Sequence, residues 1–204
     1  MFTFKVIDDF LPEVDQNFII SMVRRLEWQY NPQISGINPE SVNAPKWINM
    51  APRQNGFESV IFERGVKESF RDWTRIEPLT IAIRNTLPID PNTVRARAGM
   101  FMPTPRGGAH IPHVDYYFPH YTLLYYVNDS DGDTIIYNEK VDSVNFGVTP
   151  EYPDRFSLLD RVSPKQGRAV LFNGMHYHSS SLPKKSENRI AININIVDKS
   201  VVAL

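Results

Sequence analysis

The clearest fold signal in this sequence is the stretch 189–197, RIAININIV, in which isoleucine alternates with small and polar residues. Side chains of a β-strand point alternately to opposite faces, so the isoleucines share one face and belong to a hydrophobic layer. The other face carries Arg189, Ala191, Asn193 and Asn195. An arginine in line with small and amide residues predicts a polar cavity on this side. The alternative interpretation is a sheet with one face in water.

Upstream of this stretch, from Thr93 onward, short runs of β-forming residues alternate with turn signals such as Asp-Gly, Asn-Gly and Gly-Gly. Many short strands joined by turns are typical of an all-β sandwich or barrel. The predicted strands are Val94–Phe101, Tyr121–Val127, Thr134–Tyr137, Phe156–Asp160, Arg168–Phe172 and Arg189–Val197.

The first third of the chain has a different character. Apolar residues recur at helical spacing between Val14 and Leu26, after a predicted strand end and turn at Asp8–Pro12. Residues 30–58 are rich in Pro, Asn, Ser and Gly and predict a loop that covers or builds a site. A second helical pattern runs from Val66 to Leu87, with Pro78 as a break or kink. We therefore expect helical support over about 1–90 and a β core over about 91–204, within one domain spanning 1–204.

Composition excludes several classes of protein. The 22 basic and 23 acidic residues give a net charge of −1, so no basic surface favours a nucleic-acid partner. The sequence has no cysteine, which leaves His, Asp, Glu and backbone oxygen as ligands for a tightly bound metal. No apolar run approaches the roughly 18 residues of a membrane span. We expect a cytoplasmic protein without a membrane partner, and we leave a homodimer open.

All five histidines lie between positions 110 and 178, in the predicted β region. His113 and Asp115 form a His-x-Asp pair, whose side chains point the same way on an extended chain. His178 follows from a distant segment, and His176 competes with it. Two histidines and one carboxylate on one face of a metal leave open positions, which is the pattern of non-haem Fe(II) oxygenases. Arg189 would then offer a planar, permanently charged fork to the far carboxylate of a bound diacid.

Several motifs in this order strongly resemble the prolyl-4-hydroxylase-like branch of the 2-oxoglutarate/Fe(II) oxygenases. The resemblance covers about 94–197, with a looser match near the N-terminus. The motifs are DFLP at 9–12, HVD at 113–115, YTLLYYVN at 121–128, DGDT at 131–134, and GRAVLFNG at 167–174 followed by His178, Pro183 and Arg189.

The resemblance implies a mainly β fold with flanking helices around a double-stranded β-helix, the cupin-like jelly roll. It implies that His113, Asp115 and His178 are the iron ligands and the catalytic centre. It further implies that Arg189 and Tyr126 bind the C5 carboxylate of the cosubstrate 2-oxoglutarate. Fe(II), 2-oxoglutarate and O₂ are the implied cofactors, with ascorbate as a further candidate. The implied reaction is hydroxylation of a small molecule or peptide, with an amino acid or peptidyl proline as the first candidate, releasing succinate and CO₂.

The sequence also departs from this family. Many relatives carry a tyrosine on the strand before the His-x-Asp pair, where this chain has Met102 or Pro103. His110 and His120 are expected in loops or beside the ligands rather than among them.

The substrate-binding residues are less clear. The aromatic run Tyr116-Tyr117-Phe118 either lines the substrate entrance or packs under the loop 30–58. Arg106 is a weak candidate for substrate contact, and the loops 30–58 and 138–155 are expected to set specificity. Two other classes compete: a cupin-type metal enzyme that does not use 2-oxoglutarate, and a catalytically silent jelly-roll binding module.

Overall fold

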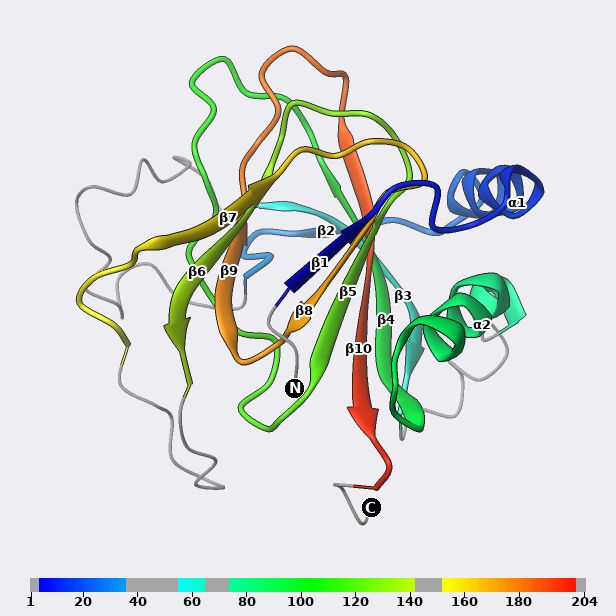
Figure 1. The fold of residues 1–204 in the computed structure, drawn as a ribbon. Helices are drawn as coiled ribbons and strands as arrows, with labels where there is room; N and C mark the ends of the chain where they lie inside the picture. Colours follow the sequence, from blue (N-terminus) through cyan, green and yellow to red (C-terminus); the bar gives the residue numbers. More distant parts are fainter. Residues whose placement is uncertain (1–3, 36–54, 65–73, 142–151, 201–204) are drawn as a thin grey trace.

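Two antiparallel sheets face each other in the computed structural model, which describes residues 4–35, 55–64, 74–141 and 152–200 (Figure 1). The larger sheet has seven strands in the order β1-β8-β5-β10-β4-β3-β2, and the smaller has three in the order β7-β6-β9. The larger sheet consists of β1 (Phe4–Ile7), β2 (Gln29–Asn31), β3 (Gly56–Glu63), β4 (Pro91–Phe101), β5 (Tyr121–Tyr126), β8 (Ala169–Asn173) and β10 (Arg189–Asp198). The smaller sheet consists of β6 (Thr134–Lys140), β7 (Leu158–Val162) and β9 (His176–Ser180).

The outer face of the larger sheet is covered by two helices, α1 (Glu13–Val23) and α2 (Glu77–Thr86), as Figure 1 shows. Strand β10 lies between β5 and β4, and the isoleucines of its core face, Ile192, Ile194 and Ile196, are fully buried. They share one hydrophobic cluster with Ile19 of α1 and Leu79 of α2. The predicted alternation of faces in this strand is therefore confirmed on its apolar side.

The inner face of the larger sheet packs against the smaller sheet. Leu124 and Tyr126 of β5 form a second apolar cluster with Ile136 of β6 and Val162 of β7. At one end of this interface, β9 joins the segment between β4 and β5 through a pair of backbone hydrogen bonds. The amide of His113 donates to the carbonyl of His178 at 3.0 Å, and the reverse bond measures 2.9 Å. This bridge brings two distant parts of the sequence to one point.

The six strands predicted from sequence are present, each with boundaries within three residues of the expected ones, and so is the first helix. The first third, however, contains more strand than its composition indicates. The segment 30–58 includes the end of β2 and the start of β3, and residues 36–54 lie outside the described residues. The strand end predicted at Asp8 agrees with the end of β1 at Ile7, whereas β2 and β3 were not predicted. β1 and β2 are edge strands of this sheet and β3 pairs with both β4 and β2, so pairing with neighbours forms these strands despite a weak local pattern.

The second helical pattern, Val66–Leu87, is confirmed only in its last part, because residues 65–73 lie outside the described residues. The break or kink predicted at Pro78 lies at the start of a helix in the described residues. Helix α2 begins at Glu77 with Pro78 in its first turn. A proline is accepted there because the first amides of a helix have no intrahelical partner to lose. Neither of the described helices is long and apolar enough to span a membrane.

Candidate functional site

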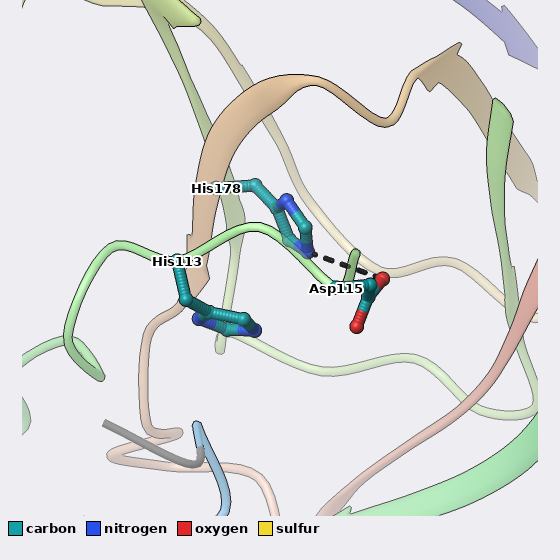
Figure 2. A group of neighbouring side chains, drawn as sticks. All are labelled: His113, Asp115 and His178. Atoms are coloured by element: carbon teal, nitrogen blue, oxygen red, sulfur yellow. Dashed lines mark ion pairs between the residues drawn. The ribbon is translucent and has the colours of Figure 1, made fainter. Parts of the chain in front are cut away.

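The side chains of His113, Asp115 and His178 lie close together, as Figure 2 shows. One ligand atom from each residue lies within 4.8 Å of the others. His178 belongs to β9, whereas His113 and Asp115 lie on the segment between β4 and β5. The Nε2 atom of His178 is 3.7 Å from Oδ2 of Asp115. The structure thus brings together the three side chains that the sequence singled out as metal ligands.

Backbone carbonyls orient both imidazoles. Nδ1 of His113 lies 2.9 Å from the carbonyl oxygen of Ile111, and Nδ1 of His178 lies 3.2 Å from that of His176. An N–H at Nδ1 leaves a lone pair at Nε2, the form in which imidazole binds a metal. Burial lowers the pKa of His178 to about 4 and also lowers that of His113, so both rings are neutral near pH 7.

The carboxylate of Asp115 is held by three nitrogen donors. Nη2 of Arg95 donates to Oδ1 at 2.7 Å, while the amides of Asn193 and Asn195 donate to Oδ2 at 3.1 and 2.8 Å. Burial by itself raises the pKa of Asp115, but the attraction of His178 and Arg95 outweighs it and holds the pKa well below its ordinary value. The group therefore offers two neutral nitrogen ligands and one anionic oxygen ligand, a donor set that suits Fe(II).

Arg189 lies in the same cavity as the two histidines, and 2% of its surface is exposed. Its Nε donates to the carbonyl of Gly132 at 2.7 Å, and its Nη2 donates to Oγ1 of Thr134 at 2.8 Å. No carboxylate of the described residues forms an ion pair with it. A buried cation without an anion is costly, so this guanidinium suits a ligand that brings a negative charge.

Tyr126 converges on the same hydroxyl as Arg189. Its phenolic oxygen donates to Oγ1 of Thr134 at 2.6 Å, and its ring lies 5.5 Å from the guanidinium carbon of Arg189. Burial raises the pKa of Tyr126, so the phenol stays protonated and can donate. The glycine at 132 makes room for this arrangement, because a Cβ there would lie 3.1 Å from Cδ of Arg189. Thr134 was not identified from sequence as a member of this pocket.

Comparison with solved structures places this architecture among known folds. No protein-family model and no curated protein matches the sequence. A 2OG-Fe(II) oxygenase family protein from Burkholderia pseudomallei matches with a TM-score of 0.62 and 9% identity, over 95% of this chain and 84% of that chain. A prolyl-4-hydroxylase from Pseudomonas putida matches with a TM-score of 0.52 and 15% identity, over 96% and 92%. The fold is that of the 2-oxoglutarate/Fe(II) oxygenases. The jelly-roll fold implied by the sequence resemblance is thereby confirmed.

A third match shows that this oxygenase fold carries more than one reaction. A non-haem α-ketoglutarate-dependent epimerase from nogalamycin biosynthesis has a TM-score of 0.60 and 13% identity, over 96% of this chain and 78% of that chain. At such identities, the likeness describes the fold. The reaction and the substrate must be argued from the residues of this chain.

The other three histidines are not members of the group formed by His113, Asp115 and His178. His176 is directed to the carbonyl oxygen of Tyr137, with Nδ1 at 2.7 Å, and it is not part of the ligand group. His120 is buried beside Tyr116 and Phe118, and its Nδ1 lies 2.7 Å from the carbonyl oxygen of Phe118. His110 lines the cavity of Arg189, where burial lowers its pKa to about 3.

Met102 and Pro103, where the sequence resemblance leads one to expect a tyrosine, are not among the residues that line this cavity. Met102, Pro103 and Arg106 line a separate cavity of about 560 Å³. Phe101 lines the cavity of Arg189 instead, with its ring 5.4 Å from the guanidinium carbon. Neither Met102 nor Pro103 supplies a hydroxyl that could replace the missing tyrosine.

Sequence reasoning missed Arg95, although a signal for it exists. Arg95 and Arg97 alternate along β4 and so share a face, and Arg95 lies directly opposite Asn195 of β10 in the register. Since the polar face of β10 was recognised, an arginine on the neighbouring strand with the same parity was a candidate for the same cavity.

Proposed function

We propose that this protein is a non-haem Fe(II) oxygenase that uses 2-oxoglutarate and O₂ to oxidise an organic substrate, with release of succinate and CO₂. One observation carries the proposal. The buried guanidinium of Arg189, without an anionic partner among the described residues, lies in the same cavity as His113 and His178, which belong to a group of two histidines and one carboxylate. The first feature calls for a ligand with a carboxylate, and the second calls for a metal with open positions.

His113, Asp115 and His178 would hold the iron, because their free ligand atoms converge and both imidazoles are neutral. When bound there, Fe(II) supplies the activation of O₂ that is coupled to the oxidative decarboxylation of 2-oxoglutarate. The role of the protein is to orient the reactants and to limit access of water. The cavity walls contribute to this through Phe101, which is buried beside Arg189.

Arg189, Thr134 and Tyr126 would hold the far carboxylate of 2-oxoglutarate. Oγ1 of Thr134 accepts hydrogen bonds from both Arg189 and Tyr126, so its own hydrogen remains available to donate to a carboxylate. The guanidinium adds charge and a fixed direction to this contact. Tyr126 thus supports the carboxylate site through Thr134 as well as by any contact of its own.

For the reaction, we propose hydroxylation of an amino acid or a peptidyl substrate of the prolyl type. The support is the resemblance of the motifs to the prolyl-4-hydroxylase-like branch and the structural match to a prolyl-4-hydroxylase. The match to an epimerase marks another oxidative outcome that the same scaffold carries.

An anaerobic titration with Fe(II) and 2-oxoglutarate tests the proposal. Chelation of Fe(II) by the 2-oxo acid gives a visible metal-to-ligand charge-transfer band, which we expect for the wild type. His178→Ala should abolish the band, whereas His176→Ala, on the same strand but outside the ligand group, should retain it.

The competing classes give different results in this titration. Metal binding without the charge-transfer band would favour a cupin-type enzyme that does not use 2-oxoglutarate. The absence of metal binding in the folded wild type would favour a silent jelly-roll module. Either result would overturn the proposal.

A further inference from the structure

The two oxygens of the Asp115 carboxylate have different neighbours. Oδ2 lies 3.7 Å from Nε2 of His178 (Figure 2) and accepts hydrogen bonds from the amides of Asn193 and Asn195, whereas Oδ1 accepts a hydrogen bond from Arg95. The side chain of Asp115 is 2% exposed and that of Arg95 is 16% exposed. Both oxygens are therefore held by nitrogen donors, and Oδ2 lies beside His178.

Arg95 takes part in a closed ring of three side chains. Its Nη2 donates to Oδ1 of Asp115 at 2.7 Å, and its Nε donates to Oδ1 of Asn195 at 3.2 Å. Nδ2 of Asn195 completes the ring by donating to Oδ2 of Asp115 at 2.8 Å. The planar fork of an arginine can make both of its bonds at once with little loss of side-chain freedom. The ring fixes the rotation of the carboxylate.

The backbone places two members of this ring before any side chain is oriented. Arg95 of β4 and Asn195 of β10 are direct cross-strand partners in the larger sheet. Asn195 is further held by its amide contact with Oγ1 of Thr122 on β5, at 3.3 Å. Asp115 lies on a segment outside these strands, and the hydrogen bonds of the ring attach its carboxylate to them.

An aromatic pair covers Arg95 from outside. The guanidinium carbon lies 5.0 Å from the ring centroid of Tyr116, which stacks on Phe118 at 4.7 Å with an interplanar angle of 27°. The cation–π contact and the stack shield the ion pair from water, which strengthens it. This gives the aromatic run after the His-x-Asp pair a structural role at the metal position.

We propose that Arg95 is a positioning residue for the metal ligand Asp115, an inference that rests on the proposed function. Arg95 binds Oδ1 and thereby fixes the orientation in which the carboxylate of Asp115 would meet a metal held together with His113 and His178. The positive charge of Arg95 also repels a metal cation, so removal of Arg95 has two opposing effects on the affinity for the metal. The orienting effect dominates, because without Arg95 a buried carboxylate loses its only ion pair to an arginine or lysine among the described residues.

The test is the affinity of the protein for Mn(II), followed by the electron paramagnetic resonance signal of the free aquo ion. Partners of metal ligands typically contribute 10–100-fold to affinity, so Arg95→Met should raise the Kd for Mn(II) by about 10–100-fold. Arg95→Lys keeps the charge but cannot make both bonds at once, and it should raise the Kd by about 3–10-fold. Arg168→Met is the control: Arg168 pairs with Asp8 outside the cavity of the two histidines, and its loss should change the Kd by less than about threefold.

Each outcome has a defined meaning. If the wild type binds no Mn(II), the proposed function fails. If the wild type binds one Mn(II) per chain and Arg95→Met binds equally or more tightly, the proposed function stands and the role of Arg95 is refuted. Circular dichroism and thermal melts of the metal-free variants report folding. If Arg95→Met does not fold, Arg95→Lys decides: an unchanged Kd refutes the role, and a raised Kd supports it.

Discussion

Replacing Arg189 by methionine should separate binding of 2-oxoglutarate from stability of the fold. Methionine keeps much of the apolar volume between Phe101 and Tyr126 and removes a buried charge. The loss leaves the carbonyl of Gly132 without its donor, at a cost of about 1–3 kcal/mol, whereas Oγ1 of Thr134 keeps the hydrogen bond from Tyr126. Removal of a buried cation that has no anionic partner stabilises the variant by a similar amount, which offsets this loss of stability. We expect the free energy of unfolding of the metal-free variant to lie within about 2 kcal/mol of the wild-type value.

The effect on the cosubstrate should be much larger. Removing one partner of a buried charge pair costs about 2–5 kcal/mol, which weakens 2-oxoglutarate binding by roughly 30-fold to 4,000-fold. At a concentration of about 100 times Kd, a ligand stabilises the native state by about 2.7 kcal/mol. For a chain of 204 residues, this corresponds to a rise in melting temperature of roughly 5–11 °C.

Thermal unfolding of the Mn(II)-loaded protein, with and without 2-oxoglutarate, measures this difference. At the same concentration, the variant should gain at most about 0.9 kcal/mol, equivalent to less than about 4 °C. Arg161→Met is the control, since Arg161 on β7 is 55% exposed and should keep the full shift when replaced. A full shift in Arg189→Met would refute the assignment of Arg189 to the carboxylate site.

Three further predictions concern activity and packing. Asp115→Ala should abolish substrate-coupled succinate formation, and full turnover in this variant would refute its role as a ligand. Gly132→Ala should lower the free energy of unfolding by about 1–3 kcal/mol, because the added Cβ would lie 2.7 Å from a backbone oxygen. Gly99→Ala is the control, because a Cβ there meets nothing within 4 Å. It should leave the free energy of unfolding unchanged or raise it by about 0.5–1 kcal/mol. Denaturant titration compares the two, and equal losses would contradict the packing described. Ile194→Ala in the buried core should lower the free energy of unfolding by about 2–5 kcal/mol. Leu158 is 58% exposed, so Leu158→Ala should lower it by less than about 0.5 kcal/mol. Similar losses of stability for the two variants in thermal melts would contradict this difference in burial.

Local patterns in the sequence determined the β core and the members of the proposed metal group. The alternation in RIAININIV identifies both faces of β10 without any tertiary information, because side-chain direction in a strand depends only on residue parity. His113 and Asp115 are recognisable for a similar reason, since two residues of separation on an extended chain favour convergence. The order of the motifs then selected His178.

Other features of the site were decided only by the tertiary structure. The bridge between β9 and the segment of His113 brings His178 next to His113. The hydrogen-bonded ring of Arg95, Asn195 and Asp115 depends on the register of β4 against β10. The contact of Tyr116 with Arg95 depends on the path of the chain after Asp115. Strands β1, β2 and β3 likewise form where the sheet offers them a neighbour. Residue parity is a property of the chain itself, whereas register and cross-cavity contacts arise from the packing of segments far apart in sequence.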